Sequence, residues 1–109
     1  MLPNGDRTIL DLRKLFDYCL NPAHSRGRHK ARVFRDSLGM RQAEAAELRA
    51  LLLSAAAHEA AIALPGDAWG DRWQIDVPIS RQGRRAVVRT IWIRRSGGQI
   101  PRFVTCWIL

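Results

Sequence analysis

The chain has 109 residues and a formal net charge of +8, with 18 Lys and Arg residues against 10 Asp and Glu. This length suits one independently folding domain, residues 1–109, and the ordinary share of apolar residues excludes an intrinsically disordered chain. No apolar run is long enough to span a bilayer, and the N-terminus lacks the segments of a signal peptide, so we expect a cytoplasmic protein without a membrane partner.

The positive charge is concentrated in the last third of the chain. Residues 72–109 contain eight arginines and a single acid, Asp76, whereas residues 1–71 contain ten cations and nine acids. The sheet expected there should therefore be the electropositive part of the molecule. Sixteen of the cations are arginines, whose planar guanidinium binds phosphate through two hydrogen bonds. This composition favours RNA or another polyanion as partner, although the arginine codons of a GC-rich genome would produce the same excess.

Three helices are predicted in the first 58 residues. The first follows Asp11, a typical N-cap, and ends before Pro22. The second spans about residues 28–38 and stops at Gly39, and the third spans about residues 41–58. The side chains expected to face the core are, in chain order, Leu12, Leu15, Phe16, Cys19, Leu20, Ala31, Phe34, Leu38, Ala45, Leu48, Leu51, Leu52 and Ala55.

The rest of the chain predicts an antiparallel meander. Residues 60–70, which contain the turn signals Pro65-Gly66-Asp67 and Gly70, are expected to form a loop between helices and sheet. Pro78 suggests an edge strand, since proline cannot donate a hydrogen bond to a neighbour. The expected strands cover about residues 73–79, 86–95 and 102–109, and the second should be central because it is apolar on both faces. The predicted fold class is α+β, with three N-terminal helices packed on a C-terminal three- to four-stranded antiparallel sheet.

The two cysteines, Cys19 and Cys106, occupy positions where apolar residues are expected. We interpret both as small buried thiols, because two cysteines are no disulfide framework. Neither has metal-ligand spacing, and the acids are too few and scattered for a two-metal carboxylate site. Phosphate-binding glycine loops and the common hydrolase motifs are also absent. We therefore predict neither a metal nor a cofactor.

A run of cations lies at the start of the second helix. Seven potential cations lie between positions 24 and 35, near a helix N-terminus whose free N–H groups favour phosphate. Because His and Lys can transfer protons near neutral pH, His29 and Lys30 are catalytic candidates. A helical wheel places Lys30 on the opposite edge of the apolar face from the arginines. The candidates for nucleic-acid binding are Arg26, Arg28, Arg32 and Arg35. The alternative is a solvated basic surface without a ligand.

Two threonines lie on neighbouring expected strands beside large aromatic residues. Thr90 shares a strand face with Trp92, Thr105 shares one with Trp107, and Arg89 lies next to the first pair. Hydroxyls beside aromatic rings can position a ribose or stack a base. Arg89, Thr90 and Thr105 are therefore further catalytic candidates, and the two tryptophans are candidates for nucleic-acid binding. The alternative is that threonine is simply a good strand former and that the tryptophans cover the helices as core.

Several separated motifs resemble one bacterial family. They are Leu2-Pro3-Asn4, Lys14-Leu15 with Tyr18, Leu20-Asn21-Pro22, residues 27–34, Ser37-Leu38-Gly39, Val88-Arg89-Thr90 with Trp92-Ile93, and residues 101–105. Together they cover nearly the whole chain and resemble the uncharacterised domain-of-unknown-function family DUF6883. Members also occur at the C-termini of large secreted or phage-associated proteins, where polymorphic toxin domains usually lie. The resemblance implies a toxin-like activity and a cognate immunity or antitoxin protein as partner.

Helices followed by an antiparallel sheet are also the layout of the small metal-independent ribonuclease toxins that resemble barnase, EndoU and RelE, which usually have four strands. By position, this resemblance makes Lys30, with His29, the helix-borne base or phosphate contact, and Arg89, Thr90 and Thr105 the contacts on the sheet. The predicted function is thus a metal-independent endoribonuclease-like toxin domain acting on RNA. The alternative is a non-catalytic module that binds nucleic acid or a protein partner in a toxin or phage system.

Overall fold

The computed structural model describes residues 1–109 as three helices followed by a four-stranded antiparallel sheet, which confirms the predicted α+β fold class. The strands follow the chain order β1-β2-β3-β4 across the sheet. The elements are α1 (Leu12–Lys14), α2 (Arg28–Leu38), α3 (Ala45–His58), β1 (Ile62–Asp67), β2 (Gly70–Arg81), β3 (Arg84–Arg95) and β4 (Arg102–Ile108). None of the helices combines the length and the apolar composition needed to cross a membrane.

The first helical segment is shorter and wider than expected. Asp11 caps α1 as predicted, since its Oδ1 accepts a hydrogen bond of 3.0 Å from the Arg13 backbone N–H. After Lys14 the chain continues as a π-helical turn over Leu15–Cys19. This wider spacing rotates the buried face away from that of an α-helical wheel. Leu15, Cys19 and Leu20 are buried as expected, whereas Leu12 and Phe16, which were also expected in the core, are exposed.

The bounds of α2 agree with the prediction, and Gly39 ends it in the left-handed region with φ 65°. A 3-10 turn over Gln42–Glu44 precedes α3, which therefore begins later than expected. The predicted stripe of α3 is buried except for Leu51, which lies at its edge and is exposed.

The expectation of a loop over residues 60–70 is wrong, because β1 forms there. This strand pairs with the first part of β2, from Gln74 to Gly70, and an irregularity between Leu64 and Asp67 accommodates Pro65 and Gly66. Nearly all of its side chains are exposed, so backbone hydrogen bonds rather than a buried face define it. β3 lies between β2 and β4, as its apolar composition predicts.

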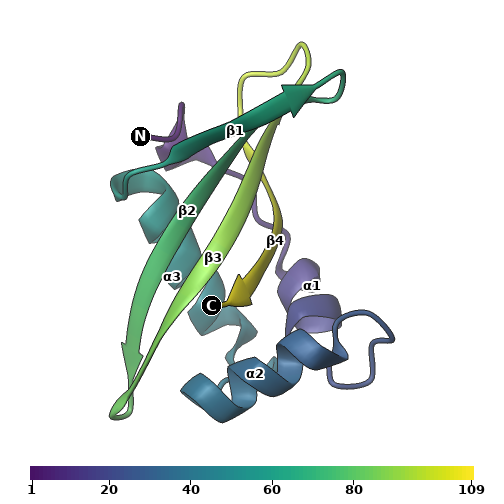
Figure 1. The fold of residues 1–109 in the computed structure, drawn as a ribbon, viewed down its shortest axis with the longest axis vertical. Helices are drawn as coiled ribbons and strands as arrows, with labels where there is room; N and C mark the ends of the chain where they lie inside the picture. The colour runs from purple at the N-terminus through teal and green to yellow at the C-terminus, as the bar shows by residue number, and fades with distance from the viewer.

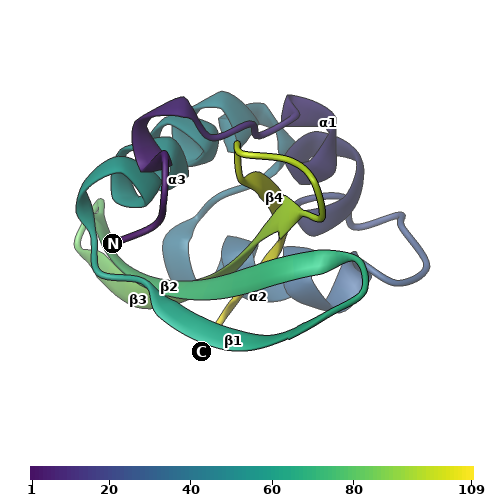
Figure 2. The same cartoon turned by 90° about the horizontal axis from the view of Figure 1, so that it is seen from above.

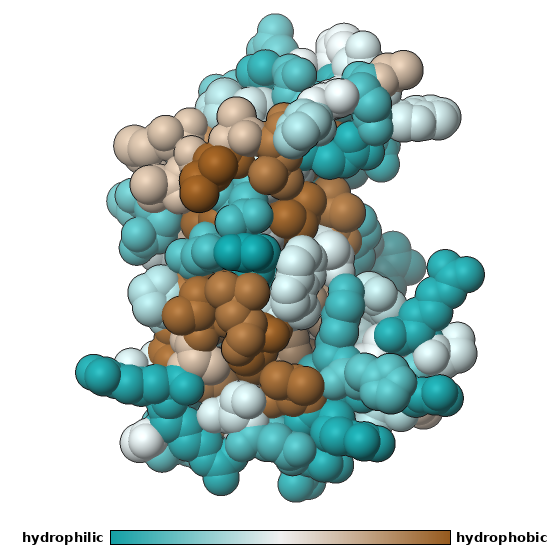
Figure 3. All heavy atoms as spheres, viewed as in Figure 1, coloured by the Kyte–Doolittle hydropathy of each residue, from teal (hydrophilic) through white to brown (hydrophobic).

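The helices leave one face of the sheet uncovered. α3 lies behind β2 and β3, and α2 lies beside the C-terminal end of β4 (Figure 1). From above, α1 and α3 lie on one side of the strands, and β1 lies on the far side from them (Figure 2). Figure 3 shows the uncovered face, on which apolar patches are separated by hydrophilic side chains. We call this the outer face.

Register decides which sheet residues reach the core. In β3 the alternate residues Val88, Thr90 and Trp92 are buried against the helices, and the residues between them point to the outer face. In β4 an irregularity opposite Ile91 and Trp92 leaves Val104 as the extra residue of a bulge. Phe103 and Cys106 are therefore the buried positions of this strand, whereas Thr105 and Trp107 are half-buried.

Candidate functional site

Lys30 on α2 and Thr105 on β4, both named from the sequence, meet in the structure. Lys30 Nζ donates a hydrogen bond of 2.8 Å to Thr105 Oγ1. The ammonium group also lies 4.9 Å from the centroid of the Tyr18 ring and 5.6 Å from that of the Trp107 ring, within range of cation–π attraction. All four side chains are half-buried, so they remain open to a ligand on one side. We call these four residues the Lys30 cluster.

The loop before α2 holds this cluster in place through His24. Its Nδ1 accepts hydrogen bonds from the backbone N–H groups of Arg26 at 3.0 Å and Gly27 at 2.9 Å, which fixes the start of the helix. Its ring also packs edge-on against Tyr18, with centroids 4.8 Å apart. Gly27 is required here, because a Cβ at this position would collide with the carbonyl oxygen of Tyr18. The sequence analysis did not select Tyr18 as a site residue, because only the folded structure brings its ring to Lys30.

Two buried thiols lie beneath the Lys30 cluster. Cys19 and Cys106 are free and fully enclosed, as predicted. The Cys19 thiol lies 3.9 Å from the Cys106 carbonyl oxygen. Hydrogen bonding with the Cys106 thiol lowers the pKa of Cys19 to about 7, and the charge of Lys30 contributes in the same direction. The same thiol contact and burial raise the pKa of Cys106. The cluster is thus anchored on a close contact between the π-helical turn and β4.

Arg89 lies next to the cluster on the outer face, directly opposite Trp107 in the strand register. Its guanidinium is already engaged, since it forms two hydrogen bonds of 2.9 and 3.0 Å with the carboxylate of Asp76 on β2. The ion pair holds the pKa of Asp76 below its ordinary value of 3.8. Arg89 is therefore near the cluster, but a phosphate would have to share it with Asp76.

Two of the residues named from the sequence, Thr90 and Trp92, lie outside this site. Both are fully buried, so neither side chain reaches solvent. Thr90 Oγ1 donates to the Ile75 carbonyl oxygen and accepts from Trp92 Nε1, each at 2.8 Å. Trp92 packs edge-on against Phe103 with ring centroids 5.5 Å apart. Their hydrogen bonds satisfy the polar groups of a large core residue, which is the structural alternative considered above.

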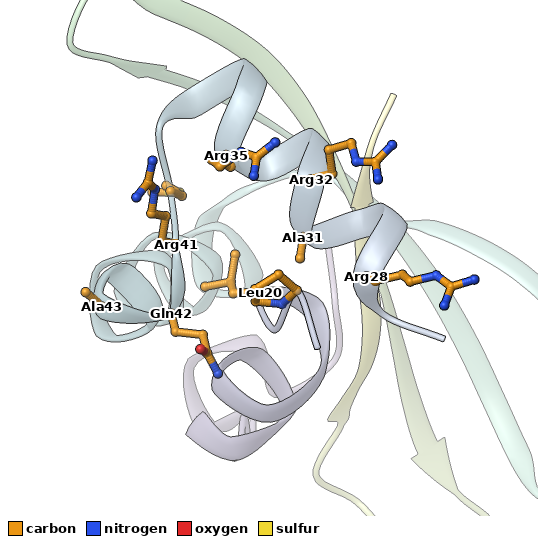
Figure 4. A pocket seen from close by; sticks show the side chains of 10 residues that line it. Leu20, Arg28, Ala31, Arg32, Arg35, Arg41, Gln42 and Ala43 are labelled. Carbon is orange, nitrogen blue, oxygen red and sulfur yellow. The ribbon is translucent and has the colours of Figure 1, made fainter. Parts of the chain in front are cut away.

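The arginines of α2 lie on a different side of the helix from Lys30. Arg28, Arg32 and Arg35 border a pocket of about 410 Å³ whose apolar wall includes Leu20. Figure 4 shows these three side chains projecting from α2, with Arg41 and Gln42 contributed by the segment before α3. The helical wheel thus predicted the arginine flank correctly. Arg26 and His29 are exposed near the start of α2 and form no side-chain hydrogen bond.

Folding neutralises about half of the positive charge that the composition predicted for the sheet. Four of the eight sheet arginines form ion pairs, with separations between 2.7 and 3.0 Å. The pairs are Arg72–Asp67, Arg81–Glu47, Arg89–Asp76 and Arg94–Asp71. Three of these acids belong to the nearly neutral first part of the chain. Unpaired positive charge is therefore found around α2 and near the turns of the sheet.

These ion pairs predict that stability falls at acid pH. The carboxyl pKa values of Glu47 and Asp76 are lowered in the folded state, in each case chiefly by the hydrogen bond from the partner arginine. The unfolded chain therefore binds protons more readily, so the contribution is present above about pH 4.5 and is lost as pH falls below about 4, toward the lowered pKa values of the folded state. Urea unfolding midpoints measured between about pH 6 and pH 3 should show this decline. An Asp76→Asn variant should show a shallower decline than Asp6→Asn, which removes an acid without an ion pair. If stability declined equally in both variants, the ion pair of Asp76 would not be a source of the pH dependence.

No group of three or more His, Cys, Asp or Glu side chains is arranged to hold a metal ion. No curated protein and no solved structure matches the chain. One family model, described as a domain of unknown function (DUF6883), matches residues 1–109, the whole chain. The family suggested by the separated sequence motifs is thereby confirmed, and the chain belongs to the DUF6883 family.

Proposed function

We propose that this protein is a metal-independent endoribonuclease that acts on RNA as a toxin-like domain. The observation that supports this most directly is the 2.8 Å hydrogen bond between Lys30 and Thr105, formed between two aromatic rings on a half-buried surface. An ammonium, a hydroxyl and an indole face are the groups needed to hold a phosphate, a ribose and a base. The cations at the start of α2 add attraction for the RNA backbone.

The chemistry proposed is cleavage by the RNA itself. The ribose 2′-oxygen loses its proton and attacks the adjacent phosphorus, the bond from phosphorus to the 5′-oxygen breaks, and that oxygen takes up a proton. The products are a 2′,3′-cyclic phosphate and a 5′-hydroxyl. Lys30 stabilises the charge on the phosphate and supplies the proton to the leaving oxygen, while Thr105 orients the ammonium. His29, exposed and adjacent in sequence, is our candidate for the acceptor of the 2′-hydroxyl proton.

The fold also supports this proposal. Three helices precede a four-stranded antiparallel meander, and β1 supplies the strand that the sequence did not predict. This order is similar to that of the ribonuclease toxins resembling barnase, EndoU and RelE. We accordingly propose that the domain acts on cytoplasmic RNA and that a cognate immunity or antitoxin protein restrains it.

The test is incubation of the purified protein with bacterial tRNA and rRNA in excess EDTA. Denaturing gels and end-group analysis should show discrete fragments that end in 2′,3′-cyclic phosphate. Intact RNA, under both low and physiological salt, would contradict the enzyme proposal.

A non-catalytic nucleic-acid-binding module is the second candidate. It is favoured by the arginine-lined pocket of α2, which lies apart from the Lys30 cluster and offers cations without a group placed for catalysis. In that case RNA would be bound with strong salt dependence and released intact. A gel shift without cleavage would select this function.

A further inference from the structure

A second basic pocket lies at the start of β4, toward the opposite end of the strand from Trp107. Its volume is about 290 Å³, and it is lined by four cations and no acid. The cations are Lys14, Arg72, Arg95 and Arg102. Arg72 is paired with Asp67, whereas Arg95 and Arg102 are exposed and form no ion pair. Two guanidinium groups are therefore free to bind an anion.

Trp69 forms one wall of this pocket, and 75% of its surface is exposed. Its backbone is nevertheless fixed, because its N–H donates to Asp67 Oδ1 and its carbonyl oxygen accepts from the Ser96 N–H, both at 2.9 Å. The second bond joins the β1–β2 turn to the β3–β4 turn, which lie together at one end of the sheet (Figure 1). The exposed indole on this fixed turn therefore offers a flat face on which a base could stack.

The pocket and the Lys30 cluster share the outer face of the sheet. Arg102 pairs with Ile93 and Thr105 pairs with Ile91, and these two isoleucines point the same way on β3. The bulge at Val104 is what places Arg102 and Thr105 on one face despite their odd spacing. At about 3.3 Å per residue, the two positions are roughly 10 Å apart along β4. A single extended ligand can therefore contact both.

We infer that the Trp69 pocket is a second nucleotide subsite for single-stranded RNA, in which a base stacks on Trp69 and the backbone phosphate binds Arg95 and Arg102. This inference rests on the proposed function, because it takes RNA as the ligand. Stacking on an aromatic side chain requires a base that is free of its own helix, so the subsite selects single strands over duplexes. It also sets the path of the RNA, which runs along β4 from the Trp69 pocket to the Lys30 cluster.

Substrate length tests the inference. A dinucleoside monophosphate fills only the Lys30 cluster, whereas a longer single-stranded oligonucleotide reaches the pocket. Trp69→Ala should lower kcat/KM for the oligonucleotide by about tenfold, within the range measured for the loss of one base stack. The same variant should leave kcat/KM for the dinucleotide unchanged. Trp69→Phe should retain most of the activity. Ile62→Ala is the matched control, because it removes an exposed apolar side chain of β1 outside the pocket. It should change kcat/KM for neither substrate.

Binding measurements separate the two proposals. Fluorescence anisotropy with the same oligonucleotide should show a weaker Kd for Trp69→Ala, and Arg95→Gln and Arg102→Gln should each reduce the slope of log K against log salt by about 0.7. If the wild type cleaves RNA and Trp69→Ala has the same kcat/KM and Kd for the oligonucleotide, the subsite is wrong and the proposed ribonuclease activity is supported. If the wild type binds RNA without cleaving it, the ribonuclease proposal is wrong. In that case a weaker Kd for Trp69→Ala would still support the subsite, and an unchanged Kd would contradict it. Equal losses on both substrates, or no RNA binding at all, would overturn the subsite.

Discussion

Replacing Lys30 with methionine is expected to slow RNA cleavage by about 10²–10⁴-fold, the range that a positioned acid or base contributes. Methionine keeps the length of the side chain and its packing against Tyr18 and Trp107, but it removes the ammonium that binds Thr105. The loss should appear as lower kcat on a dinucleoside monophosphate, measured from the release of cyclic phosphate. Circular dichroism should show an unchanged fold.

Lys14→Met is the matched control for this change, since the chain has only one other lysine. Lys14 donates to the Phe103 carbonyl oxygen at 2.9 Å and lies in the Trp69 pocket, away from the cluster. The Lys14→Met variant should therefore cleave the dinucleotide at the wild-type rate. Thr105→Val removes the hydroxyl that orients Lys30 and keeps the branched strand residue, so it should lower the rate less than Lys30→Met does. Cleavage by Lys30→Met at the wild-type rate would show that the residue assignment is wrong.

Replacing Trp92 with alanine is expected to cost about 3–5 kcal/mol of folding free energy. The side chain is fully buried, packs on Phe103 and satisfies its N–H through Thr90. Since domains of this kind are stable by only about 5–15 kcal/mol, the variant should unfold at much lower urea concentrations or fail to fold. Equilibrium urea unfolding at neutral pH measures the loss.

Two milder variants test the same placement of Trp92 in the core, even if Trp92→Ala fails to fold. Thr90→Val deletes the hydroxyl that bonds Trp92 Nε1 and should cost about 1–3 kcal/mol, the penalty for a buried donor left without a partner. Trp107→Ala truncates a half-buried residue of the Lys30 cluster and should affect stability less than Trp92→Ala while weakening RNA binding. If Trp107→Ala destabilised the protein more than Trp92→Ala, the division of the two tryptophans between core and site would be wrong.

The sequence predicted the parts of the fold that local patterns determine. α2 has an apolar face of regular spacing and a glycine at its C-terminal end, and its bounds were predicted correctly. β1 was missed because its only strong signals, Pro65 and Gly66, belong to the irregularity within the strand, and its exposed side chains show no buried alternation. Its existence depends on hydrogen bonds to β2, which a local pattern does not record.

The candidate site was predictable only in part, for a similar reason. That Thr90 shares a face with Trp92, and Thr105 with Trp107, follows from strand alternation within each strand. Which face meets the helices does not follow, because β3 carries apolar residues on both faces. The bulge at Val104 and the contact between Trp69 and Ser96 arise from tertiary pairing, so neither the shared face of Arg102 and Thr105 nor the Trp69 pocket could be found from the sequence.

The short pairing of β1 affects how another chain can approach the sheet. Beyond Gln74, the edge of β2 that faces away from β3 has no neighbouring strand. An open edge of this kind is ordinarily a template for a strand from a second molecule. Pro78 lies in this stretch, opposite Val87, whose carbonyl oxygen accepts from Leu109 on the β4 side. The proline nitrogen therefore faces the open side, where an added strand would find no donor at this position. A strand added at this edge would therefore form one hydrogen bond fewer, which makes aggregation by strand addition less favourable there.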